Sequence, residues 1–219
     1  LVGCHLESHY SKEQYAEWLE KLQQYLNEAR RKGVVVPEAE NVPEQFLLGM
    51  GGQSIESAAS LGLSFVYGVF PYIPQDPVEL AKSLSEKYRS NFKAGTHSKP
   101  SNFVLAVFVV IADTSEEAEE MAKPLDLWML GKQDFAEFHT FPTQKDVEEY
   151  EFTQRDREKI ASNRSRLIVG NPREVYEQME ALRAVSNPDE LLFIPLVGSI
   201  EKRKRSVELL AELYKGEKK

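Results

Sequence analysis

The sequence predicts an α/β fold of parallel strands, present as an incomplete (β/α)8 TIM-type barrel of about four or five βα units. Short apolar runs alternate with helical patterns through most of the 219 residues. Convincing βα units begin at about Phe46, Leu63, Phe103 and Leu191. Four such units suit a small open sheet or half of a barrel. The helix predicted over 12–32 has no strand ahead of it, which favours a barrel without its N-terminal strands.

The first predicted helix follows Ser11, a plausible N-cap, and ends at Gly33. Its apolar residues recur at helical spacing, and we expect Trp18 among them to lie in the core. The members of this stripe are Tyr15, Trp18, Leu19, Leu22, Tyr25 and Leu26.

A glycine turn separates the next strand from its helix. The apolar run Phe46-Leu47-Leu48 stops at Gly49, which is typical of a buried strand. Gly51-Gly52 predicts a tight turn before a short helix over 54–60. The segment 61–70 is again strand-like.

The centre of the chain contains the strongest strand. Pro77 suits the first position of a helix that runs to about Lys93. The run Phe103 to Ala112 is continuously apolar, as a buried parallel strand requires. Asp113 and Thr114 then cap an acidic helix, beyond which the pattern loosens.

The last third returns to alternating helices and strands. In order we expect a loop over 133–142, a helix over 153–163, an extended piece over 167–169, a helix from Asn171-Pro172 to about Val185, a strand over 191–197 and a helix over 201–214.

The composition argues against a nucleic-acid-binding or membrane-spanning protein. The chain carries 35 acidic and 27 basic residues, a formal net charge of -8, which disfavours a nucleic-acid partner. Cys4 is the single cysteine, and the longest apolar run is about half of what spans a bilayer. We therefore expect a cytoplasmic protein with no membrane partner. Residues 1–219 form one domain, with an irregular segment over 1–10.

The turn after Leu48 is the most informative local pattern. Where a strand ends and a helix begins, free backbone amides and the helix dipole favour a phosphate. The Ser54 hydroxyl adds one further hydrogen bond. The same pattern is more often a plain tight connection than a phosphate site, and both interpretations stay open at this point.

Five segments of the chain follow the order seen in one known family. They are Phe46 to Ser54, Ala58 to Phe65, Val107 to Ala118, Ile168 to Pro172 and Ser206 to Glu212. Through them, from about Tyr10 to Tyr214, the chain resembles the C-terminal part of the luciferase-like flavin monooxygenases. This is the (β/α)8 family that includes bacterial luciferase, and the resemblance implies a bacterial protein.

The resemblance implies a flavin mononucleotide (FMN) site at the glycine turn. In the family, backbone amides and a hydroxyl hold the FMN phosphate after the fifth barrel strand. Carried over, this role falls to Met50, Gly51, Gly52, Gln53 and Ser54. The family usually has a small or polar residue where Met50 stands, so we expect Met50 to offer its amide while its side chain packs.

The resemblance also implies that part of the family's site lies elsewhere. Family members carry about 100 residues ahead of this region, and these supply the catalytic histidine; the catalytic residues of this chain are therefore unknown. His5 and His9 have the spacing of a metal pair on a helix, yet Cys4 and Glu7 do not complete a ligand set. We predict no metal, and ordinary solvated polar roles for these side chains and for His97.

An aromatic loop follows the acidic helix. It contains Phe135, Phe138, His139 and Phe141, and the family has a mobile segment near this place that covers the flavin. A lid that excludes water and plain packing against the barrel rim both suit such a cluster. We expect Trp128 in the core and the basic run 202–205 on a solvated helix face.

These inferences combine into one functional hypothesis and two alternatives. The chain is expected to be a homologue of luciferase-like monooxygenases that use reduced FMN, supplied by a flavin reductase, and O2 on an aldehyde or similar apolar substrate. As a shortened chain it would lack catalytic groups. The alternatives are a flavin-binding protein without turnover and a barrel remnant that must pair with a second copy, as a homodimer.

Overall fold

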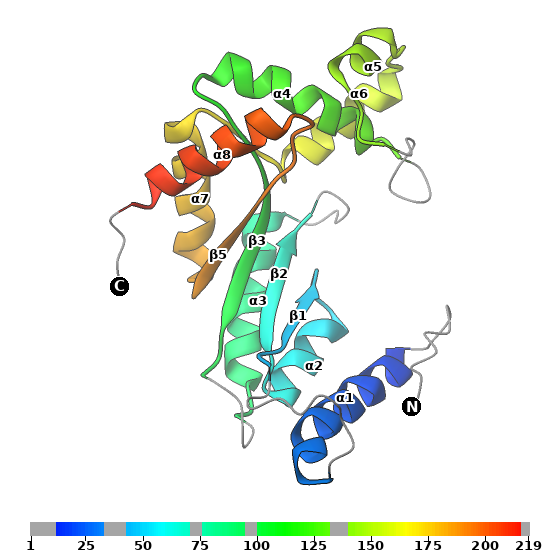
Figure 1. Cartoon of the computed structure of the whole chain (residues 1–219), viewed down its shortest axis with the longest axis vertical. Helices are drawn as coiled ribbons and strands as arrows, with labels where there is room; N and C mark the ends of the chain where they lie inside the picture. The colour runs from blue at the N-terminus through cyan, green and yellow to red at the C-terminus, as the bar shows by residue number, and fades with distance from the viewer. Residues whose placement is uncertain (1–11, 33–42, 71–75, 95–99, 132–139, 216–219) are drawn as a thin grey trace.

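The chain forms one parallel sheet with helices along one face, in a computed structural model that describes residues 12–32, 43–70, 76–94, 100–131 and 140–215 (Figure 1). The strands are β1 (Phe46–Gly49), β2 (Ser64–Val69), β3 (Phe103–Ile111), β4 (Ile168–Gly170) and β5 (Glu190–Pro195). The helices are α1 (Lys12–Lys32), α2 (Gln53–Leu61), α3 (Pro77–Asn91), α4 (Ser115–Trp128), α5 (Gln144–Glu149), α6 (Gln154–Arg164), α7 (Pro172–Ser186) and α8 (Ile200–Leu213).

All strand pairs are parallel, and β3 is the centre of the sheet. Val107 pairs with Val69 of β2 and with Phe193 of β5, so these two strands lie on opposite edges of β3. The short β4 pairs with the far end of β3, from Val109 to Ile111, beyond the end of β2. The sheet therefore has four lateral positions, in the order β1, β2, β3 and β5, with β4 extending the β2 position.

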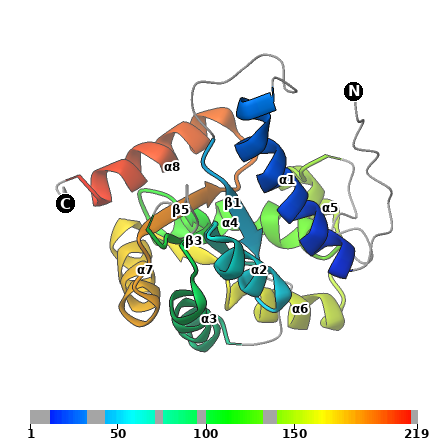
Figure 2. The same ribbon diagram turned by 90° about the horizontal axis from the view of Figure 1, so that it is seen from below.

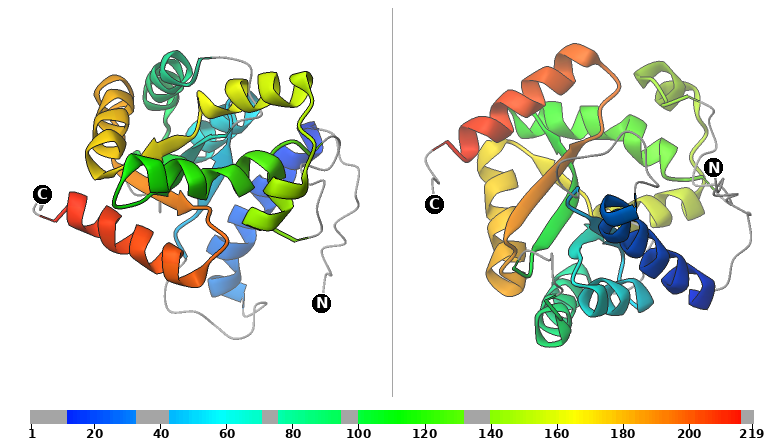
Figure 3. Two further views of the ribbon diagram at one scale, coloured as in Figure 1. Left: turned by 90° about the horizontal axis from the view of Figure 1, so that it is seen from above. Right: turned by 60° about the horizontal axis from the view of Figure 1, so that its bottom comes forward.

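Helices cover one face of this sheet. Figure 2 shows α2, α3 and α7 side by side beneath the strands, and Figure 3 shows that α8 continues the row into an arc. This arrangement is that of an incomplete (β/α)8 barrel, as the alternating pattern predicted. Among the residues that the structure describes, no helix is both long and apolar enough to cross a membrane.

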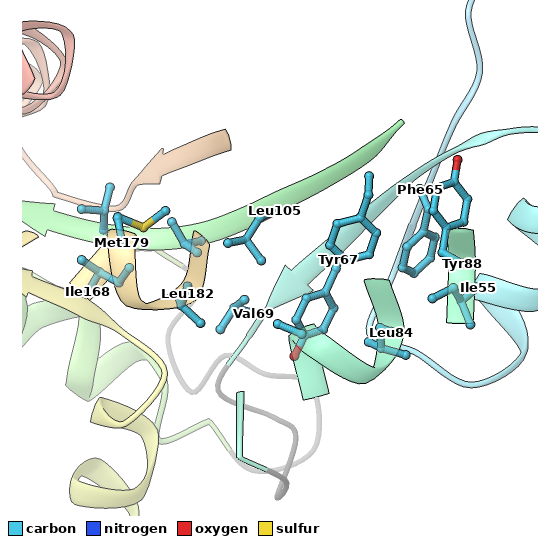
Figure 4. Close-up of a cluster of buried hydrophobic side chains, with 14 of the residues drawn as sticks. Ile55, Phe65, Tyr67, Val69, Leu84, Tyr88, Leu105, Ile168, Met179 and Leu182 are labelled. Carbon is cyan, nitrogen blue, oxygen red and sulfur yellow. The ribbon is translucent and has the colours of Figure 1, made fainter. Parts of the chain in front are cut away.

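The main core lies between the sheet and this arc of helices (Figure 4). Tyr88 of α3 is fully buried there, and its ring lies 6.0 Å from those of Phe65 and Phe103. Its hydroxyl donates to the Leu63 carbonyl at 2.8 Å and accepts from the Asn102 amide at 3.2 Å. Tyr88 therefore ties the starts of β2 and β3 to the helix that covers them.

The opposite, concave face of the sheet is apolar and thinly covered. Val66, Val104 and Ala106 are buried there in a small cluster with Ile194. Three larger apolar residues of the flanking strands, Phe46, Leu48 and Leu192, are 48%, 57% and 47% exposed. Within the described part of the chain, one side of the sheet thus lacks the cover that the helices give the other.

Helices α4 to α6 lie past the carboxyl end of β3 (Figure 1). A second core cluster joins α4 to Val110, Leu167 and Val197. Arg164 of α6 makes a two-pronged contact with Asp126 of α4, with Nε–Oδ1 and Nη2–Oδ2 distances of 2.7 and 2.8 Å. The side chain of Asp126 is only 8% exposed, so this ion pair is largely shielded from water.

Three features depart from the sequence-based expectations. Trp18 is 45% exposed, so its predicted place in the core is wrong: only one side of α1 packs, through Leu19, against the main cluster. Helix α5 lies beyond the predicted loop and has no buried residue, so it leaves no apolar pattern to detect. The strand expected over 61–70 is shorter, because α2 continues to Leu61.

Candidate functional site

The candidate site is the turn between β1 and α2, at the carboxyl edge of the sheet. Two glycines form it, and both have left-handed backbones, with φ of 115° at Gly51 and 64° at Gly52. A Cβ atom placed on Gly51 lies 3.2 Å from Leu84, whereas one on Gly52 meets nothing within 4 Å. The turn is therefore closed on the side of α3 and open at Gly52.

The start of α2 differs from the starts of the other helices that follow strands. Helices α3, α4, α7 and α8 have their first amides bound by a side chain of the preceding residue: Asp76, Thr114, Asn171 and Ser199. Helix α2 has Gly52 at this position, which offers no side chain. Its first-turn amides thus lack the usual intramolecular acceptor and retain the capacity to bind an anion.

The predicted site residues take different parts in this turn. The Ser54 hydroxyl donates to the Gly51 carbonyl at 2.8 Å, so it holds the turn in shape. Gln53 and Gly52 are exposed. Met50 is 44% exposed, which corrects the expectation that its side chain packs: it follows the last residue of β1 and lies outside all three buried clusters.

A close contact makes the turn dependent on Gly49. A Cβ atom at Gly49 would lie 2.1 Å from the Ser54 hydroxyl and 2.8 Å from the Ser54 Cβ. We expect Gly49→Ala to lower the free energy of unfolding by about 2 kcal/mol through this overlap. Urea denaturation checks the value, and adding Ser54→Gly to the Ala variant should recover much of the loss. Strictly additive losses in the double variant would contradict the contact.

The floor beneath the turn is apolar and neutral. Leu84 packs under Gly51, and Figure 4 shows Tyr67 beside Leu84 in the main core. Burial raises the pKa of Tyr67 to about 12, an effect that nearby Arg166 only partly opposes. Tyr67 is therefore uncharged at neutral pH, and it adds no negative charge near the turn.

Other strand ends are already occupied by internal contacts. After β3, Asp113 binds the Arg205 guanidinium through both oxygens, at 3.1 and 2.5 Å, and this contact holds the Asp113 pKa below its usual range. After β4, Glu174 accepts from the Ser115 hydroxyl at 2.8 Å and from the Asn171 amide at 3.0 Å. The contacts of Asp113 with Arg205 and of Ser115 with Glu174 were not predicted, because their partners are 92 and 59 residues apart.

Aromatic side chains gather near the same edge. Phe70 and Phe108 stack with ring centroids 4.7 Å apart, and Phe70 lies directly over Gly68. Of the predicted aromatic loop, Phe141 packs 6.0 Å from Trp128, on the α4 side. This contact fits the rim-packing alternative for Phe141, and Trp128 packs against the second core cluster.

Several predicted residues cannot be placed. Phe135, Phe138, His139, His97, His5, His9 and Cys4 lie outside the described residues. Within the ranges that the structure covers, no three His, Cys, Asp or Glu side chains are grouped as metal ligands.

Comparison with known proteins identifies similar chains. A family model described as luciferase-like monooxygenase matches residues 7–186. The uncharacterized protein YceB of Bacillus subtilis (strain 168) is 31% identical over 172 residues, which cover 78% of this chain and 50% of YceB. N-acetyl-S-alkylcysteine monooxygenase of the same organism is 27% identical over 177 residues, 80% of this chain and 51% of the relative.

Two solved structures share the fold. Apo-MsnO8 superposes with a TM-score of 0.74 at 24% identity and covers 94% of this chain and 61% of that one. DmoA from Hyphomicrobium sulfonivorans superposes with a TM-score of 0.57 at 15% identity, over 95% of this chain and 57% of that one. The chain thus spans half to three fifths of the length of the relatives that it matches here.

Proposed function

Because the chain belongs to the luciferase-like monooxygenase family, we propose that its glycine turn binds the phosphate of FMN in a flavin-dependent monooxygenase. The observation that carries this proposal is the missing side-chain cap at the start of α2. Among the described helices that follow strands, α2 is the one whose first-turn amides lack a side-chain cap. A dianionic phosphate supplies the acceptor that the other helices take from their own sequence.

The residues of the turn fit a phosphate in shape and charge. Gly52 leaves open space at the end of the helix, where a side chain would stand in the way of the ligand. The amides of Gln53 and Ser54 belong to the first turn of α2, where the positive end of the helix dipole lies. Met50 and Gly51 contribute backbone alone, and Ser54 keeps the turn closed.

The chemistry proposed for the bound cofactor is that of the family. Reduced FMN, delivered by a separate flavin reductase, supplies the electrons that activate O2 for insertion into an aldehyde or similar apolar substrate. The chain's own contribution is to fix the phosphate and to present an apolar, uncharged surface beside it. The stacked pair of Phe70 and Phe108 adds to that surface at the carboxyl edge.

Titration with two flavins tests the phosphate site. We expect FMN to bind at least about tenfold more tightly than riboflavin, which has the same ring system and no phosphate, an advantage of about 1.4 kcal/mol. Quenching of flavin fluorescence gives both constants, and inorganic phosphate should compete with FMN alone. Equal affinities for the two flavins would contradict a phosphate role for the turn, and absence of binding by either would contradict flavin binding by this chain.

A further inference from the structure

The four methionines of this chain differ in their exposure, and all four lie within the described residues. Met121 and Met129 belong to the second core cluster and are 7% and 3% exposed, and Met179 is fully buried in the main core. Met50 is 44% exposed and lies outside all three buried clusters. Because an oxidant must reach the thioether sulfur to react with it, Met50 is the methionine of this chain that is open to oxidation.

The position of Met50 in the turn gives its oxidation a consequence. Met50 precedes Gly52, the uncapped start of α2, by two residues, so its place beside the first-turn amides is set by the chain itself and not by what covers the sheet. Its side chain is unbranched and has three rotatable bonds, which let it fold back over the turn. A Cβ atom on Gly52 meets nothing within 4 Å, so no neighbouring group fills the space beside the amides of Gln53 and Ser54. As a thioether, Met50 accepts hydrogen bonds only weakly and leaves those amides to another acceptor.

We propose that hydrogen peroxide converts Met50 to its sulfoxide, and that the sulfoxide oxygen then binds the amides that otherwise hold the FMN phosphate. Regulation of this kind rests on the function proposed for the turn. In the reaction the sulfur attacks one oxygen of the peroxide, the O–O bond breaks and an S–O bond forms. The sulfur is oxidised by two electrons, and the second peroxide oxygen takes up the proton of the first and leaves as water.

The oxidant and the consequence belong to the same chemistry. Hydrogen peroxide forms when electrons intended for a substrate pass to O2 alone. A sulfoxide oxygen carries partial negative charge and accepts hydrogen bonds, so it suits the positive end of α2, where the phosphate is proposed to bind. Oxidised Met50 therefore lowers the affinity for FMN and with it the rate of further peroxide formation, and enzymatic reduction of the sulfoxide reverses the change.

Limited oxidation of the purified chain, without flavin, tests the first step. Hydrogen peroxide should place the first oxygen atom that any methionine gains on Met50, as peptide mass mapping reveals, while the three buried methionines react later. Fluorescence titration of this protein should give an FMN affinity lowered at least about fivefold, the effect of a typical helix cap on an equilibrium, with a much smaller change for riboflavin. Treatment with methionine sulfoxide reductases A and B, which act on the two epimers, should restore the FMN affinity.

Two variants separate the sulfoxide from other effects of peroxide. Met50→Leu keeps an apolar side chain without sulfur, so peroxide should no longer change its FMN affinity, although Cys4 remains available for oxidation. Met50→Gln carries a permanent amide oxygen on a side chain of similar length and should bind FMN more weakly than Met50→Leu without any peroxide.

Several outcomes contradict the role of Met50. A first oxygen on a buried methionine, an FMN affinity unchanged by oxidation of Met50, equal losses for FMN and riboflavin, or a Met50→Leu chain that loses FMN affinity as the parent does would each overturn the proposal. If the untreated chain prefers FMN and one of these results follows, the phosphate site stands and the regulation alone fails. An untreated chain that does not prefer FMN would overturn the phosphate site and its regulation together.

Discussion

Replacing Arg164 by Met is expected to lower the free energy of unfolding by about 3 kcal/mol at neutral pH, because it leaves a buried carboxylate without its cation. Asp126 is largely buried and receives both of its short contacts from this guanidinium. Met keeps much of the volume of the arginine stem and removes the charge. Urea denaturation of the variant and the parent measures the difference.

The pH dependence of this variant follows from the Asp126 pKa. Burial raises that pKa above its ordinary value, and Arg164 opposes the rise. Without Arg164 the folded-state pKa rises further, and an acid with a raised pKa binds its proton more readily in the folded state. The variant should therefore regain stability, relative to the parent, as the pH falls through the raised pKa, and lose it again as the pH rises.

Two further variants test whether burial makes the Arg164–Asp126 pair more important for stability than an exposed ion pair. Asp126→Asn added to Arg164→Met should recover a large part of the loss, since no buried charge remains. Arg173→Met removes an exposed i,i+4 contact to Glu177 and should leave the free energy of unfolding almost unchanged. Similar losses for Arg173→Met and Arg164→Met would contradict the special role of burial.

Gly52→Glu is expected to weaken FMN binding more than about tenfold, because it places a carboxylate at the start of α2. The open space around Gly52 lets the side chain enter without displacing a neighbour. The introduced carboxylate can accept hydrogen bonds from the amides proposed for the phosphate, and its negative charge repels the dianion. Flavin fluorescence titration at low and high salt measures the loss, which should shrink as salt screens the repulsion.

Gly52→Gln is the matched control for this variant. It has nearly the same shape and the same left-handed backbone strain at φ 64°, without the charge. We expect Gln to weaken FMN binding much less than Glu, and riboflavin binding to respond equally to both. Equal losses of FMN affinity for Glu and Gln would show that shape or strain, and not charge, decides binding at the turn.

The fold was predictable where local signals and long-range packing agree. The run from Phe103 is apolar at every position because nearly every side chain of β3 is buried, on both faces of the sheet, and the structure confirms the strand to Ile111. Pro77 and Asn171-Pro172 mark the starts of α3 and α7 correctly, because capping depends on neighbours in sequence. Helix α5 left a different local signal, the capping pair of Thr143 and Asp146, which an apolar pattern does not detect.

Exposure and distant contacts were harder to predict. Trp18 and Met50 are apolar, yet whether they are buried depends on which surfaces face them in the fold. The Arg164–Asp126 pair joins residues 38 positions apart, and nothing in either local sequence indicates the other. The position of the turn at Gly51-Gly52 could be predicted from the sequence. The lack of a side-chain cap on α2 stands out only when α2 is compared with the other helices that follow strands, which are capped.

The return of β4 to the far end of β3 has an evolutionary consequence. Helices α4 to α6 leave the sheet after Ile111 and rejoin it at Ile168, where the pairing with Val109 restores the scaffold's register. The intervening excursion can therefore gain or lose segments over many generations while the strands stay aligned. A change of length between Ile111 and Ile168 thus leaves the pairing of the parallel strands intact.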